Sequence, residues 1–91
     1  MEPRRNDLAF LLGALARLHS AEVPCLVFGG WAEELLGMGL PRFHADVDLL
    51  LPAADFTAVE RFITKEAASE VRGKGFAHKR AFLLDGVLVE L

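Results

Sequence analysis

The stretch FGGWAEELLGMGLPRFHADVDLLLP, residues 28–52, places two glycines at the end of one apolar run and two aspartates at the start of the next. The first run, CLVF at residues 25–28, combines β-branched and aromatic residues and predicts a short buried strand. The second, DVDLLL at residues 46–51, is polar at its entry and apolar afterwards, as in a central strand whose beginning reaches an open face. Between them, WAEELLG contains good helix formers, with Gly37 or Gly39 available as a C-terminal cap.

The rest of the chain adds two helices and two strands to this strand–helix–strand unit. Leucines at three- and four-residue spacing predict a helix that is capped by Asn6 or Asp7 and ends near Ser20. Asp55 can cap a third helix, and RAFLLDGVLVEL at residues 80–91 predicts two strands joined by a tight turn at Asp85–Gly86. The expected order is αβαβαββ, which is an α/β (α+β) fold class.

Length and composition indicate one globular domain spanning residues 1–91. The chain is 53% hydrophobic and 25% charged, and its formal net charge of -3 argues against a protein that coats nucleic acid. The apolar N-terminal segment carries charges on both sides, so we expect an amphipathic helix rather than a signal peptide or membrane span. We therefore expect a cytoplasmic protein without membrane contact. Cys25 is the one cysteine, and we expect a buried, reduced thiol.

Asp46 and Asp48 are two residues apart, so in a strand their side chains point to the same face. Two carboxylates about 5 Å apart repel by roughly 3 kcal/mol at an effective dielectric constant near 20, and a bound divalent cation reverses that repulsion. Mg²⁺ suits such a pair. If the last strand lies beside the second, Glu90 completes the cluster while its two neighbours face the core. The alternative is a loop residue followed by an exposed strand end, with no metal.

Gly29 and Gly30 follow a predicted strand and precede a predicted helix. Glycine lets a backbone approach a ligand closely, and free amides at a helix start favour an anion such as phosphate. The alternative is a tight strand-to-helix turn without a ligand. The combination of strand, paired glycines, helix, paired aspartates and a later strand carboxylate is more specific than either motif alone.

These residues carry a family resemblance. GGWAEELLG and RFHADVDLLLP resemble the nucleotidyltransferase-fold superfamily, in particular the branch of bacterial aminoglycoside and lincosamide nucleotidyltransferases, and the likeness extends over about residues 25–91. It is strongest at Gly29–Ala32 together with His44, Asp46 and Asp48. The resemblance implies a small mixed β-sheet flanked by helices, two Mg²⁺ ions, and transfer of a nucleoside monophosphate from a nucleoside triphosphate to a hydroxyl.

Residue by residue, the resemblance implies that Asp46 and Asp48 ligate the metals and that Gly29 and Gly30 cradle the phosphates. Glu90 takes the third carboxylate position, where an aspartate is more common and where the longer side chain can act as a base through water. The sequence stops one residue later, whereas family enzymes usually continue into elements that shape the acceptor pocket. We therefore expect a minimal version of the fold.

Several further residues have two interpretations. Arg42 and His44 are candidates for phosphate contact, and His44 is equally a candidate for ordering the loop. Trp31 is a core anchor or a base-stacking residue. Residues 71–84 contain no acid, and their cations could offset a triphosphate or belong to a solvated loop: Arg72, Lys74, His78, Lys79 and Arg80.

Three functional hypotheses follow. The first is a Mg²⁺-dependent nucleotidyltransferase acting on a hydroxyl of a small, antibiotic-like molecule or of a protein. The second is a noncatalytic module that uses a sheet edge, left open by the terminal strand, to pair with itself or with a second subunit, as in some toxin–antitoxin pairs. The third is an antibiotic-resistance enzyme active only as a homodimer.

Overall fold

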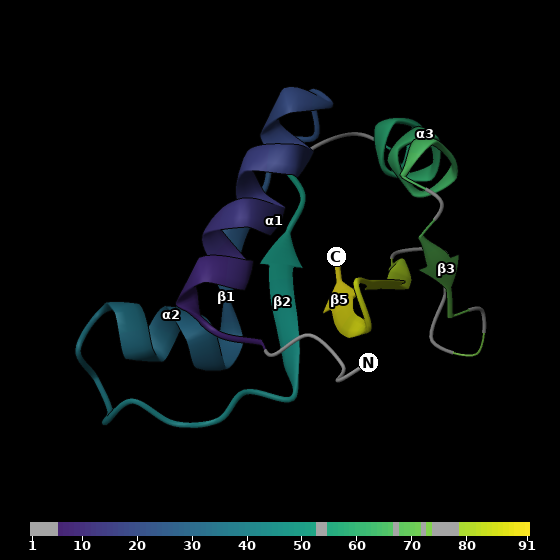
Figure 1. Cartoon of the computed structure of the whole chain (residues 1–91). Coiled ribbons are helices and arrows are strands. Elements are labelled where there is room, and N and C mark those ends of the chain that lie inside the picture. Colours follow the sequence, from purple (N-terminus) through teal and green to yellow (C-terminus); the bar gives the residue numbers. More distant parts are fainter. Residues whose placement is uncertain (1–5, 53–54, 67, 72, 74–78) are drawn as a thin grey trace.

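The computed structural model describes residues 6–52, 55–66, 68–71, 73 and 79–91. Within these residues the chain forms three helices and one five-stranded mixed sheet, an α+β arrangement (Figure 1). The elements in chain order are α1 (Leu8–Ser20), β1 (Leu26–Phe28), α2 (Gly29–Leu35), β2 (Asp46–Leu50), α3 (Thr57–Lys65), β3 (Ser69–Glu70), β4 (Ala81–Leu84) and β5 (Val87–Glu90).

The sheet has the strand order β1-β2-β5-β4-β3. β2 and β5 run parallel, with Val47 opposite Val89 and Asp48 opposite Glu90. The other three pairings, β1 with β2, β5 with β4 and β4 with β3, are antiparallel. The central parallel pair therefore brings together two segments that are about forty residues apart in the sequence.

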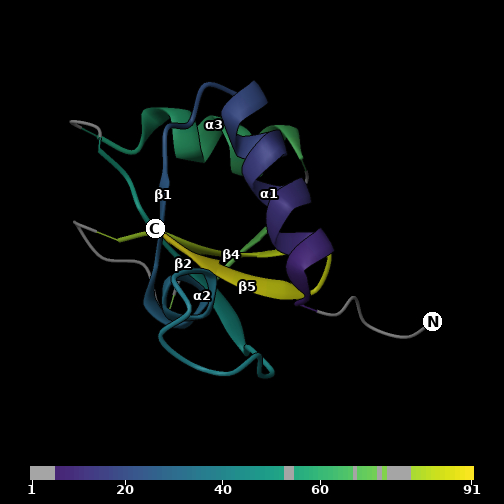
Figure 2. The same cartoon turned by 90° about the vertical axis from the view of Figure 1, so that its left-hand side faces the viewer.

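One face of the sheet is covered and the other is open. α1 and α3 lie on the same face (Figure 2), and the alternating apolar residues of β2 and β5 are buried on that side. α2 packs separately, against β1 and β2. The core combines these strand residues with the inner faces of the helices: Phe10, Leu11, Leu18, Trp31, Val47, Leu49, Val59, Phe62, Phe82, Leu84, Val87 and Val89. The residues between the buried strand positions, including Asp46, Asp48 and Glu90, are left on the open face.

Local signals in the sequence set the ends of several elements. Asp7 is the N-cap of α1 and accepts the Phe10 N–H at 2.8 Å. The predicted tight turn is confirmed, because Asp85 and Gly86 both have positive φ, at 51° and 83°. Gly37, with φ of 72°, follows the end of α2. Asp55 accepts the Thr57 N–H at 3.0 Å where α3 begins.

Three expectations about the strands were wrong. The first run is an edge strand rather than a buried one, because only Val27 faces the helices while Leu26 and Phe28 are 59% and 53% exposed. The order αβαβαββ lacked β3, whose two residues pair only with β4 and are too short to produce an alternating pattern. The terminal strand β5 lies between β2 and β4, so it leaves no open edge.

None of the helices in the described part of the chain combines the length and the apolar character needed to cross a membrane.

Two leucines on the same helix test the core assignment. Leu18 is fully buried and Leu12 is 56% exposed, although both belong to α1. We expect Leu18→Ala to lower the free energy of unfolding by about 2–5 kcal/mol, because it removes packed apolar surface and leaves a cavity. Leu12→Ala should change it by no more than about 0.5 kcal/mol. Urea unfolding measures both, and equal losses would contradict the placement of α1 on the sheet.

Candidate active site

Three carboxylates meet on the open face of the sheet. Asp46 and Asp48 come from β2 and Glu90 comes from β5, and each offers an oxygen that lies within 4.8 Å of the other two. All three residues are half-buried. The grouping follows from the parallel register, since Asp48 and Glu90 are direct partners and Asp46 is two residues away on the same face. We call these residues the acidic trio. The sequence predicted all three members.

The acidic trio concentrates negative charge in a partly desolvated place. Burial raises the pKa of the Asp48 carboxyl above its ordinary value, and the negative charges of Asp46 and Glu90 raise it further. Lys79 supplies a compensating charge, with its Nζ 2.5 Å from Glu90 Oε2. The bond to Glu90 in turn raises the pKa of Lys79. The site is therefore suited to attract a further cation.

The β1–α2 turn passes directly against the acidic trio. Gly29 has φ of 69°, and a Cβ on this residue would lie 2.7 Å from Asp48 Oδ2. A side chain here would therefore be strained and would also displace the carboxylate. At Gly30 a Cβ would collide with the Arg42 guanidinium and would lie 3.2 Å from His44 Nδ1. Close packing against Asp48 and a positive φ therefore favour glycine at position 29, whereas at Gly30 the shortest contact is with the flexible end of the exposed Arg42 side chain.

A shallow cavity of about 250 Å³ opens beside two members of the trio. Its walls combine charged and apolar groups: Phe28, Asp48, Leu49, Leu50, Lys79, Glu90 and Leu91. Phe28 reaches it because this residue is the register partner of Asp48 in the antiparallel β1–β2 pair. The cavity gives a small molecule access to Asp48 and Glu90.

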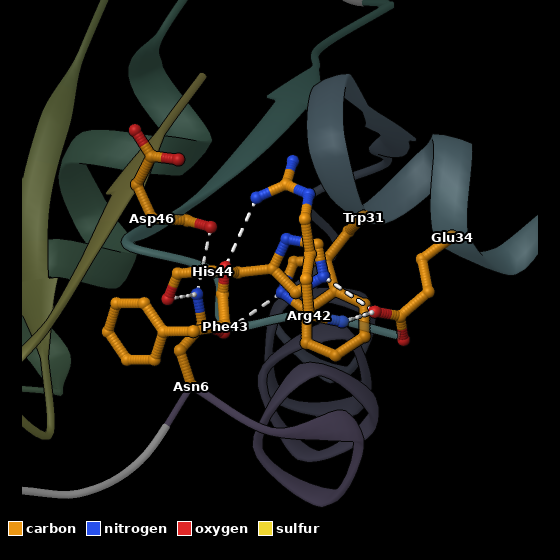
Figure 3. Close-up of polar contacts among 7 residues, drawn as sticks. All are labelled: Asn6, Trp31, Glu34, Arg42, Phe43, His44 and Asp46. Carbon is orange, nitrogen blue, oxygen red and sulfur yellow. Dashed lines mark hydrogen bonds and ion pairs between the residues drawn. The ribbon is translucent and has the colours of Figure 1, made fainter. Parts of the chain in front are cut away.

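His44 lies outside the acidic trio. Its side chain is 3% exposed, stacks on Trp31 with ring centroids 4.1 Å apart, and places Nε2 2.9 Å from Glu34 Oε1 (Figure 3). This geometry favours the loop-ordering role over phosphate contact. Trp31 is 3% exposed, which confirms it as a core residue.

Arg42 belongs to the same cluster. Its backbone N–H donates to Glu34 Oε1 at 3.0 Å, and its guanidinium Nη1 donates to the Phe43 carbonyl at 3.1 Å (Figure 3). Of the basic segment predicted between residues 71 and 84, Lys79 reaches the trio and Arg80 pairs with Glu60. Arg72, Lys74 and His78 lie outside the described residues.

Sequence reasoning missed three individual roles. It placed Lys79 only in a basic run. Lys79 lies just before β4, however, and β4 pairs with β5 in the predicted hairpin, so the pairing of these strands would have indicated that Lys79 is near Glu90. It assigned no contacts to Glu34, yet this carboxylate binds both His44 and the Arg42 backbone. The accepted bonds lower the pKa of Glu34, with that from His44 the largest cause. The third residue, Asn6, was considered only as a helix cap.

Comparisons of the chain with models of protein families, with curated proteins and with solved structures found no match. The chemistry that the site can support therefore depends on its own residues. Three half-buried carboxylates, a nearby lysine and a bare glycine turn together form a place where a divalent cation and an anionic group could both be accommodated.

Gly29 provides a first test of this arrangement. We expect Gly29→Ala to lower the free energy of unfolding by roughly 1–2 kcal/mol from the left-handed backbone alone, and by more because of the contact with Asp48. Gly13→Ala is the matched control, because a Cβ there meets no described atom within 4 Å and Gly13 lies inside α1. It should stabilise the protein by up to about 1 kcal/mol. If Gly29→Ala left the free energy of unfolding unchanged, the close contact between the Gly29 turn and Asp48 would be contradicted.

The raised pKa of Asp48 predicts how the contribution of this residue to stability changes with pH. A raised folded-state pKa means that the contribution of Asp48 to stability is present below its ordinary pKa of 3.8 and is lost as the pH rises through the folded-state pKa. In metal-free buffer, Asp48→Asn should therefore raise the urea midpoint at pH 7 and change it less at pH 4.

Asp55 supplies the opposite case. The Thr57 backbone N–H lowers its pKa, so its contribution is present above the ordinary value and is lost as the pH falls. Asp55→Asn should lower the urea midpoint at pH 7. A lowered midpoint for Asp48→Asn at pH 7 would contradict the electrostatic account of the acidic trio, and a raised midpoint for Asp55→Asn would contradict the role given to the Thr57 N–H.

Proposed function

We propose that this chain is a small nucleotidyltransferase-fold protein that, with Mg²⁺, transfers a nucleoside monophosphate from a nucleoside triphosphate to a hydroxyl group of a second molecule. The observation that carries the proposal is the acidic trio, whose oxygens gather within 4.8 Å on an open sheet face. The Gly29 turn beside Asp48 supports it, because the two features have different structural origins and converge on one place.

The donor set fits Mg²⁺. Its members are carboxylates, the hard oxygen ligands that this ion prefers, and their half-burial leaves room for water and phosphate oxygens to share the ion. The raised pKa of Asp48 reflects desolvation and repulsion that a divalent cation would relieve. Asp46 and Asp48 would hold two Mg²⁺ ions with help from Glu90, and bound there the metal would neutralise phosphate charge and lower the pKa of the attacking hydroxyl.

The turn residues would bind the triphosphate. The Gly29 backbone packs directly against the Asp48 carboxylate, so a phosphate bound to a metal held by Asp48 would lie next to this turn. Lys79 lines the same cavity as Asp48 and Glu90 and would neutralise phosphate charge once its partner Glu90 faces a cation. Phosphate binding would thus be shared between the backbone of the Gly29 turn and the Lys79 ammonium group.

Glu90 would also take part in proton transfer. Its side chain is 12% exposed and borders the cavity, where an acceptor hydroxyl could lie next to the carboxylate. A carboxylate in that place can accept the proton that the hydroxyl releases, directly or through one water. Phe28, Leu50 and Leu91 would hold the apolar part of an acceptor, which could be a small antibiotic-like molecule or a protein side chain.

The proposal predicts nucleotide binding that depends on Mg²⁺. A nucleoside triphosphate at about 100 times its dissociation constant should add about 2.7 kcal/mol to the free energy of unfolding, which raises the melting temperature by at least several degrees. The rise should require Mg²⁺ and should disappear in Asp48→Asn. Differential scanning fluorimetry with a panel of nucleoside triphosphates measures it.

Glu66→Gln is the matched control, because Glu66 is a carboxylate that pairs with Arg17 away from the trio. It should keep the Mg²⁺-dependent rise. A rise that survives Asp48→Asn would contradict the site assignment. If no nucleotide changes the melting temperature and the protein is a dimer without metal, the noncatalytic interaction module replaces the proposal.

A further inference from the structure

Asn6 joins three parts of the chain that are distant in sequence. Its Nδ2 donates to the His44 carbonyl at 3.0 Å and to the Asp46 carbonyl at 2.8 Å (Figure 3). Its Oδ1 accepts the Trp31 indole Nε1–H at 3.0 Å. The side chain is half-buried, in the segment just before α1. One amide thus connects this segment, α2 and the start of β2.

The chemistry of the partners allows one orientation of this amide. The indole nitrogen of Trp31 can only donate, and the two backbone carbonyls can only accept. Rotating the amide by 180° would place an oxygen against two oxygens and an NH₂ group against an N–H. All three hydrogen bonds would be lost, so the orientation of Asn6 is well determined.

Trp31, which donates a hydrogen bond to Asn6 Oδ1, is itself held in place by core packing. Trp31 is 3% exposed and belongs to the hydrophobic core. Its ring also stacks on His44, whose Nε2 is bonded to Glu34. The chain entering β2 is therefore fastened through the His44 side chain by α2 and through its backbone by Asn6.

The point that Asn6 holds is the first residue of the acidic trio. Asp46 is the first residue of β2, so sheet pairing holds the chain after this residue but not before it. The preceding residue, Ala45, is exposed. Binding the carbonyls of residues 44 and 46 fixes the backbone on both sides of Ala45. This sets the direction in which the Asp46 Cα–Cβ bond leaves the strand.

We propose that Asn6 is a positioning residue that holds the Asp46 carboxylate in the acidic trio through the backbone of residues 44–46. The inference rests on the proposed function insofar as Asp46 binds a metal. Some groups orient a metal-binding residue by hydrogen-bonding to it without touching the ion. Removing such a group commonly weakens metal binding by about 10–100-fold. Asn6 would act in this way without touching the ion.

Asn6→Asp tests the proposal with almost no change in shape. The carboxylate still accepts the Trp31 N–H, but both donated bonds are lost and an oxygen faces two carbonyls. The added negative charge by itself would favour a cation, so weaker binding cannot be explained by charge. Asn6→Ala removes the bonds without adding charge. Mn²⁺ alone is the probe, and its free concentration is followed by electron paramagnetic resonance.

Asp7→Ala is the matched control. Asp7 is adjacent to Asn6 and caps α1, and losing the cap bond lowers stability by about 0.5–2 kcal/mol. We expect both Asn6 variants to bind Mn²⁺ about tenfold or more weakly, and Asp7→Ala to bind it within about twofold of the unaltered protein. Equal affinities in Asn6→Asp and in the control would overturn the proposal.

A metal-free measurement separates this inference from the proposed function. Backbone amide hydrogen exchange at residues 45–48 should become faster in Asn6→Asp and stay unchanged, relative to global stability, in Asp7→Ala. If the unaltered protein binds no Mn²⁺, the proposed function fails while the exchange result still decides the role of Asn6. Should the Asn6 variants not fold, Trp31→Phe removes the indole donor together with part of the ring that packs on His44. Exchange at residues 45–48 that stays unchanged relative to global stability in this variant would then overturn the proposal.

Discussion

The parallel pairing of β2 with β5 is the constraint on which the rest of the structure depends. It places Asp48 opposite Glu90 on the open face and Val47 opposite Val89 in the core. Side chains alternate along a strand, so a slip of one residue in β5 would bury Glu90 and expose Val89. The register that completes the hydrophobic core is therefore the same register that assembles the acidic trio. Core packing and site geometry cannot vary independently.

The site also opposes the stability of the fold. Three carboxylates share a half-buried face, and burial and mutual repulsion raise the pKa of Asp48. The left-handed Gly29 turn brings the backbone against that same carboxylate. Local features that reduce stability are expected at sites retained for binding or chemistry, because a ligand supplies the missing compensation. Lys79 provides part of this compensation through its bond to Glu90.

Much of this architecture could be predicted from local patterns. Alternation placed Asp46 and Asp48 on one face, and the Asp85–Gly86 dipeptide predicted the turn that returns β5 beside β4. Other features depend on neighbours that a sequence pattern does not reveal. An apolar run looks the same in an edge strand as in a buried one, so the exposure of Leu26 and Phe28 was missed.

The hydrogen bonds around the β2 entry lay beyond sequence reasoning for a different reason. Asn6 binds carbonyls 38 and 40 residues away, and backbone carbonyls carry no sequence signal. The Glu34–His44 bond similarly depends on the path of the loop between α2 and β2. These contacts follow from the tertiary fold. The sequence therefore placed His44 near the site but did not decide between loop ordering and phosphate contact.

The central claim of the proposed function is that Asp46, Asp48 and Glu90 together bind divalent cations. Paramagnetic broadening of backbone amide resonances by substoichiometric Mn²⁺ in ¹⁵N-labelled protein tests it most directly, because broadening falls steeply with distance from the ion. The account predicts broadening centred on residues 46–48 and 88–90, two segments that meet only through the β2–β5 register, with Glu60 and Glu66 on and after α3 unaffected. Broadening centred on other carboxylates, or broadening of one of these segments without the other, would contradict it.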